Sequence, residues 1–230
     1  MGGMDIVSVI LTPFFVLAVT YTVAPPSPSR LAMLLKCLPI VCLCGLVIAV
    51  TLGSATHTQL IQRYNTAVIV GLALSGIGDA ALVYVDDQGF FILGLLFFAL
   101  AHLSYIYAFG WKPVNIPLLF PCFILACIGY SLVYQGLAEH NLVFLGGLYT
   151  VLLMLIGWRA LARARLSESR WTWTQLAAPL GALFFCFSDA TLAMNKFYKP
   201  IPYSQTIVMS TYYAGQLGIA LSVLGHDSKM

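Results

Sequence analysis

Eight long apolar stretches divide this chain and leave only short connections between them. They cover approximately 6–24, 31–52, 64–84, 89–109, 115–135, 141–162, 173–194 and 203–224. About 20 mostly apolar residues are enough for a helix to cross the hydrocarbon core of a bilayer. Of the 230 residues, 60% are hydrophobic and 8% are charged, which excludes an ordinary soluble domain. We therefore predict an all-α integral membrane protein, with residues 1–230 forming one transmembrane domain, a bundle of eight transmembrane helices.

The basic residues predict how this bundle is oriented. With eight spans both termini lie on one side, together with these residues: Arg63, Lys112, Arg159, Arg163, Arg165, Arg170 and Lys229. The other side carries Arg30, Lys36, Lys196 and Lys199. Because cytoplasmic loops carry an excess of Lys and Arg, we predict that both termini are cytoplasmic, and we name the opposite face lumenal. The first apolar stretch lacks a basic start and a good cleavage context, so we predict a retained span rather than a signal peptide.

Several classes of function lose support from the sequence. The net charge of +3 is scattered along the chain, so a nucleic-acid partner is not indicated. The six cysteines fall in apolar stretches without CxxC spacing, and we expect small buried apolar residues rather than a metal site. The chain contains no GxSxG, HExxH or Walker motif, which disfavours serine-nucleophile and metal-dependent hydrolysis.

Two aspartates lie inside apolar stretches, Asp79 in the third and Asp189 in the seventh. An Asp at the centre of a transmembrane helix costs roughly 2.5–3.5 kcal/mol on insertion scales, so each is a candidate functional residue. Asp79 lies seven residues before Asp86, and Asp189 lies seven before Lys196, which places both ~10 Å below the lumenal surface at 1.5 Å per residue. Lys36 lies at a similar depth, ~9 Å. The sequence therefore predicts one layer that contains two carboxylates and one amine.

Two interpretations of this layer remain open. In the first, Lys36 forms a salt bridge that holds three helices together, and its long side chain reaches toward the surface. That interpretation accounts for one aspartate and leaves the other without a role. In the second, the carboxylates act as a pair, because two neighbouring carboxylates resist ionising together and one keeps its proton near neutral pH.

Further polar residues lie deeper in the apolar stretches. His102 and Tyr105 are three residues apart on one helical face, and Tyr212 and Gln216 are four apart on another. Counted from Asp87, His102 lies ~22 Å from the lumenal side, too far to contact the aspartates directly unless the helices tilt strongly. We therefore expect His102 to line the site rather than to act as a base, and an interhelical hydrogen bond is the alternative.

Two short likenesses carry little weight. "GDAALVY" (78–84) is similar to "SDATLAM" (188–194), which suggests a duplicated four-helix unit but could arise by chance in apolar sequence. Residues 76–79 read GIGD, which resembles the GxGD motif of presenilin-like aspartyl proteases. In that family the GxGD aspartate is the second of the pair and a PAL motif follows it, whereas here it is the first and PAL is absent.

A longer set of motifs resembles the lysoplasmalogenase family of eight-span membrane proteins over nearly the whole chain. These motifs are, in order, "KCLP" (36–39), "GDAAL" (78–82), "AHLSYIYAF" (101–109), "FSDATLAMNKF" (187–197) and "TYYAGQ" (211–216). The last motif more usually reads YYxAQ in that family. Gly215 takes the place of the Ala, a difference that we expect to matter only where packing is tight.

The resemblance implies hydrolysis of the vinyl ether bond of a lysoplasmalogen to a fatty aldehyde and glycerophosphoethanolamine or glycerophosphocholine, without a cofactor or metal. The reaction needs a protonated acid and an ionised carboxylate, as in glycosidases, and we expect Asp79 and Asp189 to supply them. The residues expected to bind the substrate are Lys36, His102, Tyr105, Asn195, Tyr212 and Gln216. A membrane of the endoplasmic reticulum is the expected location. The alternative is a proton-coupled transporter of a small or lipid-like solute, because buried Asp and His residues also relay protons.

Overall fold

The computed structural model describes residues 3–24, 27–53, 58–164 and 173–227, and within these ranges the regular structure is helical, with no strand. Eight long helices follow one another along the chain: α1 (Gly3–Val23), α2 (Arg30–Gly53), α3 (Gln59–Ala81), α4 (Gln88–Phe109), α5 (Ile116–Glu139), α6 (Val143–Arg163), α7 (Trp173–Phe197) and α8 (Ser204–Leu221). A short 3₁₀ helix, η1 (Leu82–Tyr84), extends α3, and the short α9 (Leu224–Asp227) follows α8. The predicted all-α fold is confirmed.

The helices have the length and composition of a membrane protein. Six of the described segments are long and apolar enough to cross a bilayer: α2, α3 with η1, α4, α5, α6 and the part of α7 from Leu176 onward. A shorter apolar segment, Val7–Val23, lies in α1. Each of the eight predicted stretches coincides with one long helix. The chain is therefore an integral membrane protein.

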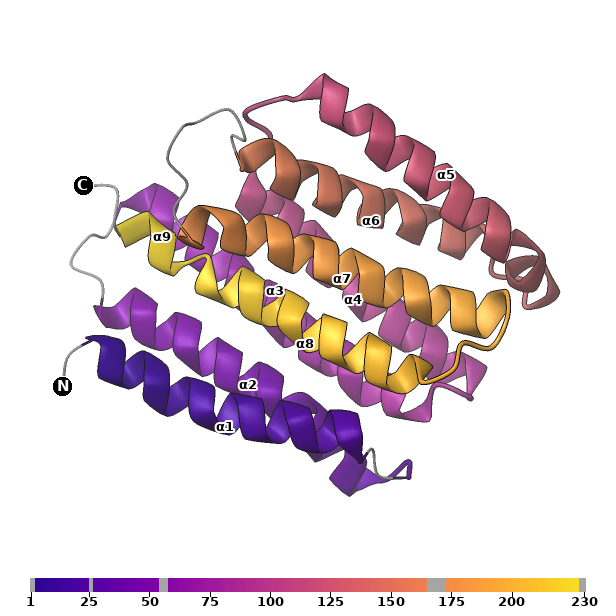
Figure 1. Ribbon diagram of the computed structural model, residues 1–230, viewed down its shortest axis with the longest axis horizontal. Helices are drawn as coiled ribbons and strands as arrows, with labels where there is room; N and C mark the ends of the chain where they lie inside the picture. Colours follow the sequence, from indigo (N-terminus) through magenta and orange to yellow (C-terminus); the bar gives the residue numbers. More distant parts are fainter. Residues whose placement is uncertain (1–2, 25–26, 54–57, 165–172, 228–230) are drawn as a thin grey trace.

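The long helices run side by side in one bundle (Figure 1). Figure 1 shows α1 and α2 at one edge of this bundle and α5 at the opposite edge. The beginning of α1 and the end of α8 with α9 lie at the same end of the bundle. This end also contains the beginning of α7, while the connections from α1 to α2, from α3 to α4 and from α7 to α8 lie at the other end.

A tight connection sets α3 against α4 near the first aspartate. The Asp87 side chain caps α4 by accepting hydrogen bonds from the backbone N–H groups of Gly89 (2.8 Å) and Phe90 (3.1 Å). Farther into the bundle, a Cβ added at Gly78 would lie 2.9 Å from the ring of Phe98. The two helices can approach this closely only because residue 78 has no side chain. Asp79 follows directly, so this contact fixes its position.

Glycine also brings α7 and α8 into backbone contact. A Cβ added at Gly215 would lie 2.9 Å from the Gly181 carbonyl oxygen and 2.9 Å from the Phe185 backbone nitrogen. Packing at Gly215 is therefore tight, and the departure from the family's usual Ala matters at this position. The contact fixes the part of α8 that carries Tyr212 beside the part of α7 that leads to Asp189.

A buried arginine fastens the connection between α4 and α5. The Arg159 side chain is fully buried, and it donates hydrogen bonds from Nε to the Gly110 carbonyl (2.6 Å) and from Nη1 to the Pro113 carbonyl (2.9 Å). Arg159 belongs to the basic group that we used to predict topology, and in the structure it also holds the connection between α4 and α5 in place. Arg165, Arg170 and Lys229 of that group lie outside the described residues.

The cysteines are less buried than expected. Five of the six are half-buried, and Cys127 is exposed on α5. In a membrane protein the outer face of a helix contacts lipid, so an apolar side chain needs no protein core around it. The expectation that all six are buried was therefore wrong.

Candidate active site

Asp79 is held from both sides of its carboxyl group. Lys36 on α2 places Nζ 3.6 Å from Oδ1, and the Tyr212 hydroxyl on α8 donates a hydrogen bond to Oδ2 at 2.5 Å. Asp79 is 2% exposed, and Lys36 is also buried. A buried carboxylate with a cation on one oxygen and a hydroxyl donor on the other is in a setting that favours its ionised form. The predicted proximity of Lys36 and Asp79 is confirmed.

Asp189 has a different set of neighbours. The Tyr149 hydroxyl on α6 donates a hydrogen bond to Oδ2 at 2.5 Å, and His102 Nε2 on α4 lies 3.6 Å from the same oxygen. His102 Nδ1 lies 2.5 Å from the Phe98 carbonyl oxygen, which can only accept, so Nδ1 carries the proton and Nε2 of the neutral ring has a lone pair. A lone pair that faces a carboxyl group is favourable when the carboxyl group holds a proton. His102 therefore favours a neutral Asp189, and among the described residues no Lys or Arg lies beside Asp189 to balance its charge as Lys36 does at Asp79.

Aromatic rings connect the two carboxyl groups. The Phe185 ring lies 4.9 Å from the His102 ring and 5.6 Å from the Tyr212 ring, measured between centroids. Phe98 lies 5.8 Å from Tyr212 and 6.0 Å from Phe185. The rings therefore lie between the neighbours of Asp79 and the neighbours of Asp189.

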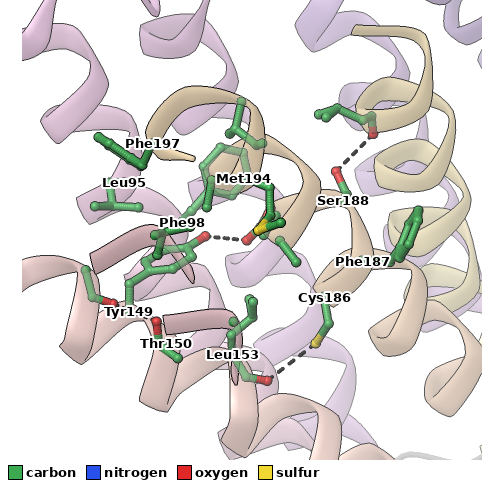
Figure 2. Close-up of a pocket in the computed structure, with 18 of the residues that line it drawn as sticks. Leu95, Phe98, Tyr149, Thr150, Leu153, Cys186, Phe187, Ser188, Met194 and Phe197 are labelled. Carbon is green, nitrogen blue, oxygen red and sulfur yellow. Dashed lines mark hydrogen bonds between the residues drawn. The ribbon is translucent and has the colours of Figure 1, made fainter. Parts of the chain in front are cut away.

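Both carboxyl groups line one apolar cavity of about 510 Å³. Its lining residues come from α2 to α8, and its charged members among the described residues are Lys36, Asp79 and Asp189. Figure 2 shows Phe197 toward one end of the cavity, Leu153 and Cys186 toward the other, and Tyr149 between them. A volume of this size is within the range of about 300–1,000 Å³ that is typical of small-molecule sites.

Five of the six residues predicted to bind substrate lie in three different places. Lys36 and Tyr212 line the cavity, beside Asp79. Tyr105 and Gln216 are fully buried and pair with each other, because the Tyr105 hydroxyl donates a hydrogen bond to Gln216 Oε1 at 2.7 Å. Asn195 is near the end of α7, where its side chain accepts a hydrogen bond from the Ile201 backbone at 2.9 Å.

The expectation that His102 lies too far from the aspartate layer for direct contact was wrong. It assumed that Asp87 and Lys196 lie at one level, but the Phe197 ring packs 5.6 Å from the ring of Phe91, one turn inside α4. Counted from that contact, Asp189 lies about 12 Å and His102 about 16 Å along their helices. Side chains bridge the remaining difference. His102 is fully buried beside Asp189 and is not among the residues that line the cavity.

Sequence reasoning missed Tyr149. It lies in the apolar run "GGLYTVLLML", where a tyrosine attracts less attention than a charged residue. The available signal was its polar hydroxyl near the centre of a span, since a buried Tyr hydroxyl needs a hydrogen-bond partner.

Comparison with known proteins identifies the family. The chain matches the model of the YhhN family over residues 31–223. It is 42% identical to the human protein "Lysoplasmalogenase TMEM86A" over 217 residues, which cover 93% of this chain and 88% of the relative. It is 39% identical to the human protein "Lysoplasmalogenase TMEM86B" over 197 residues, which cover 85% of this chain and 76% of the relative. No solved structure matches the chain. The resemblance carried by the five ordered motifs is thus confirmed, and the chain belongs to the YhhN family of lysoplasmalogenase-like membrane proteins.

Proposed function

We propose that this protein is a lysoplasmalogenase, a hydrolase that cleaves the vinyl ether bond of a lysoplasmalogen. The observation that carries the proposal is the pair of aspartates that line one apolar cavity with unlike neighbours, a cation beside Asp79 and a neutral His–Tyr pair beside Asp189. Relatives with this name align over most of the chain. The cavity's apolar walls suit a hydrocarbon chain, and the carboxyl groups suit acid catalysis at the ether.

The unlike neighbours suggest different roles for the two aspartates. Asp189 is the proton donor, because its Oδ2 is engaged by Tyr149 while no hydrogen bond to Oδ1 is found within the described residues. Asp79 is the ionised partner, because Lys36 balances its charge. This division of labour between a neutral acid and a charged carboxylate is the arrangement that glycosidases use for a similar cation.

The reaction follows from these roles. Asp189 protonates the vinyl carbon that is not bonded to oxygen, and the positive charge that forms on the neighbouring carbon and the ether oxygen is stabilised by Asp79. Water adds to that carbon and gives up a proton to a carboxylate, which produces a hemiacetal. The hemiacetal hydroxyl then gives up its proton to a carboxylate and forms the C=O bond of the aldehyde, while the bond from that carbon to the glycerol oxygen breaks and the glycerol oxygen takes a proton from the carboxylic acid. One water is consumed, and a fatty aldehyde and the glycerophospho-headgroup are released.

The remaining predicted residues support this chemistry in the proposal. Lys36 keeps Asp79 ionised, and Tyr212 orients it. His102 lies behind Asp189 and stabilises the protonated form, and Tyr105 with Gln216 supports the wall behind the site. Asn195 shapes the connection from α7 to α8.

The proposal also includes the setting of the enzyme. We propose eight spans with both termini in the cytoplasm, a single transmembrane domain and a location in the endoplasmic reticulum. The beginning of α1 and the end of the described chain lie at one end of the bundle (Figure 1), as an even number of spans requires.

Product analysis tests the function. The purified protein is incubated in parallel with alkenyl, alkyl and acyl lysophospholipids of equal chain length, and only the alkenyl lipid is expected to yield aldehyde. Asp79→Asn and Asp189→Asn variants that remain folded should release none. Aldehyde release at the wild-type rate by either variant would exclude that residue from the mechanism. Release of fatty acid from the acyl lipid would show that the protein hydrolyses an ester instead of a vinyl ether. Solute uptake into sealed vesicles without its consumption would instead favour the transporter.

A further inference from the structure

The cavity is long and follows the helices. Its lining residues run from Cys122 to Leu137 on α5 and from Leu183 to Phe197 on α7. Each run of 15 or so residues extends over about 21 Å of helix. Asp189 lies near the middle of the α7 run, so the cavity continues in both directions from the carboxyl group. One direction leads toward Phe197 and the other toward Cys122.

The end near Phe197 is closed between α5 and α7. A Cβ added at Gly136 on α5 would overlap the Phe197 carbonyl oxygen, so the two backbones touch there. Val133 and Leu137, which line the cavity beside this contact, are buried. A lipid chain therefore has no path between the helices at this end.

The other half of the cavity opens sideways. Leu125 on α5 and Leu183 and Phe187 on α7 line the cavity, yet they are 69%, 42% and 55% exposed. A side chain that both lines a cavity and is exposed lies at its rim. Figure 1 shows α5 and α7 farther apart at this end than at the end where they touch, with α6 between them in this view. The rim therefore borders an opening between the two helices.

This opening faces hydrocarbon rather than water. It lies midway along two helices that are long and apolar enough to span a bilayer. On the outer face of the same part of α5 lie large, apolar, exposed residues, namely Phe120, Phe123, Ile124 and Ile128. Exposed side chains of this kind on a transmembrane helix contact lipid chains.

We propose that the gap between α5 and α7 is a lateral portal through which the alkenyl chain of the substrate passes from the bilayer to the carboxyl groups. This inference rests on the proposed function. The occupant is the single hydrocarbon chain of a lysophospholipid, because the opening is apolar, faces the membrane interior and leads without a break to Asp79 and Asp189. A chain too long for the cavity can leave its end in the bilayer.

Gly129 offers a way to block the portal. It lies on α5 among the lining residues, and a Cβ added there would meet no atom within 4 Å. A large side chain at this position has room to extend into the opening, so Gly129→Trp should obstruct the portal while the helix keeps its packing. Ile128→Trp is the matched control, because Ile128 is the neighbouring residue, is exposed and does not line the cavity.

The experiment compares a lysoplasmalogen with a hexadecenyl chain and an analogue with a butenyl chain, which is too short to extend into the portal. In Gly129→Trp, kcat/KM for the long chain should fall at least about tenfold while the short-chain value stays within about twofold of wild type, because the binding energy of the remote chain is lost. Ile128→Trp should leave both values near wild type. If Gly129→Trp does not fold, Leu125→Trp at the rim replaces it as the blocking variant, with the same expected results.

Three results would overturn the portal. These are an equal loss for both substrates in the blocking variants, no loss for either, or the same selective loss in Ile128→Trp. Wild-type protein that cleaves neither substrate would refute the proposed function itself. Wild-type cleavage of both substrates, with one of these three results, refutes the portal alone.

Discussion

Lys36 and Asp79 form an ion pair in which neither side chain is more than 8% exposed. Removing one partner of a buried ion pair leaves an uncompensated charge and typically costs about 3–5 kcal/mol. We predict that Lys36→Met lowers the thermal unfolding temperature in detergent and abolishes aldehyde release, because Asp79 then takes up a proton. The double variant Lys36→Met with Asp79→Asn should recover stability but not activity. Full activity of Lys36→Met would show that Asp79 needs no cation.

Tyr149 donates its hydroxyl to Asp189, the proposed acid. We predict that Tyr149→Phe lowers kcat about tenfold with little change in KM, because one hydrogen bond that orients the carboxyl group is lost. Tyr130→Phe is the control: Tyr130 also lines the cavity, but its hydroxyl donates to the Val143 backbone carbonyl at 3.1 Å. Steady-state kinetics of aldehyde release measure both variants. Equal effects of the two substitutions would assign Tyr149 a packing role only.

At the scale of residues, the sequence predicted the charged part of the candidate site and missed its neutral part. Asp79, Asp189 and Lys36 stand out because charged groups are costly in an apolar stretch. A tyrosine costs less free energy inside a membrane than a charged residue does, so the position of Tyr149 in an apolar stretch did not distinguish it. His102 was noticed but misplaced, since its contact with Asp189 depends on the relative depth of α4 and α7, which residue counting from loop ends does not give.

Helices α7 and α8 meet backbone to backbone at Gly215 and Gly181. We predict that Gly215→Ala destabilises the protein by about 1–3 kcal/mol, because the added methyl group would overlap backbone atoms that cannot move independently. It should also reduce activity, since Tyr212 lies three residues earlier on α8 and must reach Asp79. Gly45→Ala on α2 is the control, because a Cβ there meets nothing within 4 Å and alanine favours a helix. Thermal unfolding in detergent compares them, and a stabilising Gly215→Ala would contradict the tight contact.

At the scale of elements, hydropathy predicted where helices occur better than where they end. Each apolar stretch contains one helix, but α5 continues to Glu139 and α7 to Phe197, beyond the predicted ends at 135 and 194. Apolar residues mark the part of a helix that lies in hydrocarbon, whereas a helix ends at its last backbone hydrogen bonds and caps. Contacts between these extended ends, such as Gly136 with Phe197, set the relative depth of the helices and could not be predicted from composition.

The orientation of the whole bundle decides which side of the membrane receives the headgroup product. The loop between α7 and α8 is near the end of the cavity that contains Phe197, and the beginning of α1 lies at the opposite end of the bundle (Figure 1). The excess of Lys and Arg on the side of the termini predicts that this side is cytoplasmic. We predict that epitope tags at both termini are digested by protease added to sealed endoplasmic reticulum microsomes, and that a tag between Phe197 and Ser204 is protected until detergent is added.

The three tags separate the parts of this topology. Two exposed termini with a protected loop require an even number of spans and the cytoplasmic orientation. Two protected termini with an exposed loop would keep the even number and invert the bundle, so that the headgroup would be released into the cytoplasm. Termini on opposite sides would exclude eight spans, and the helix to reconsider first would be α1 or α8, which are not among the six segments that qualify as spans by length and composition within the described residues. Because a helix that does not cross the bilayer cannot hold Tyr212 at the depth of Asp79, α8 is constrained by the site itself.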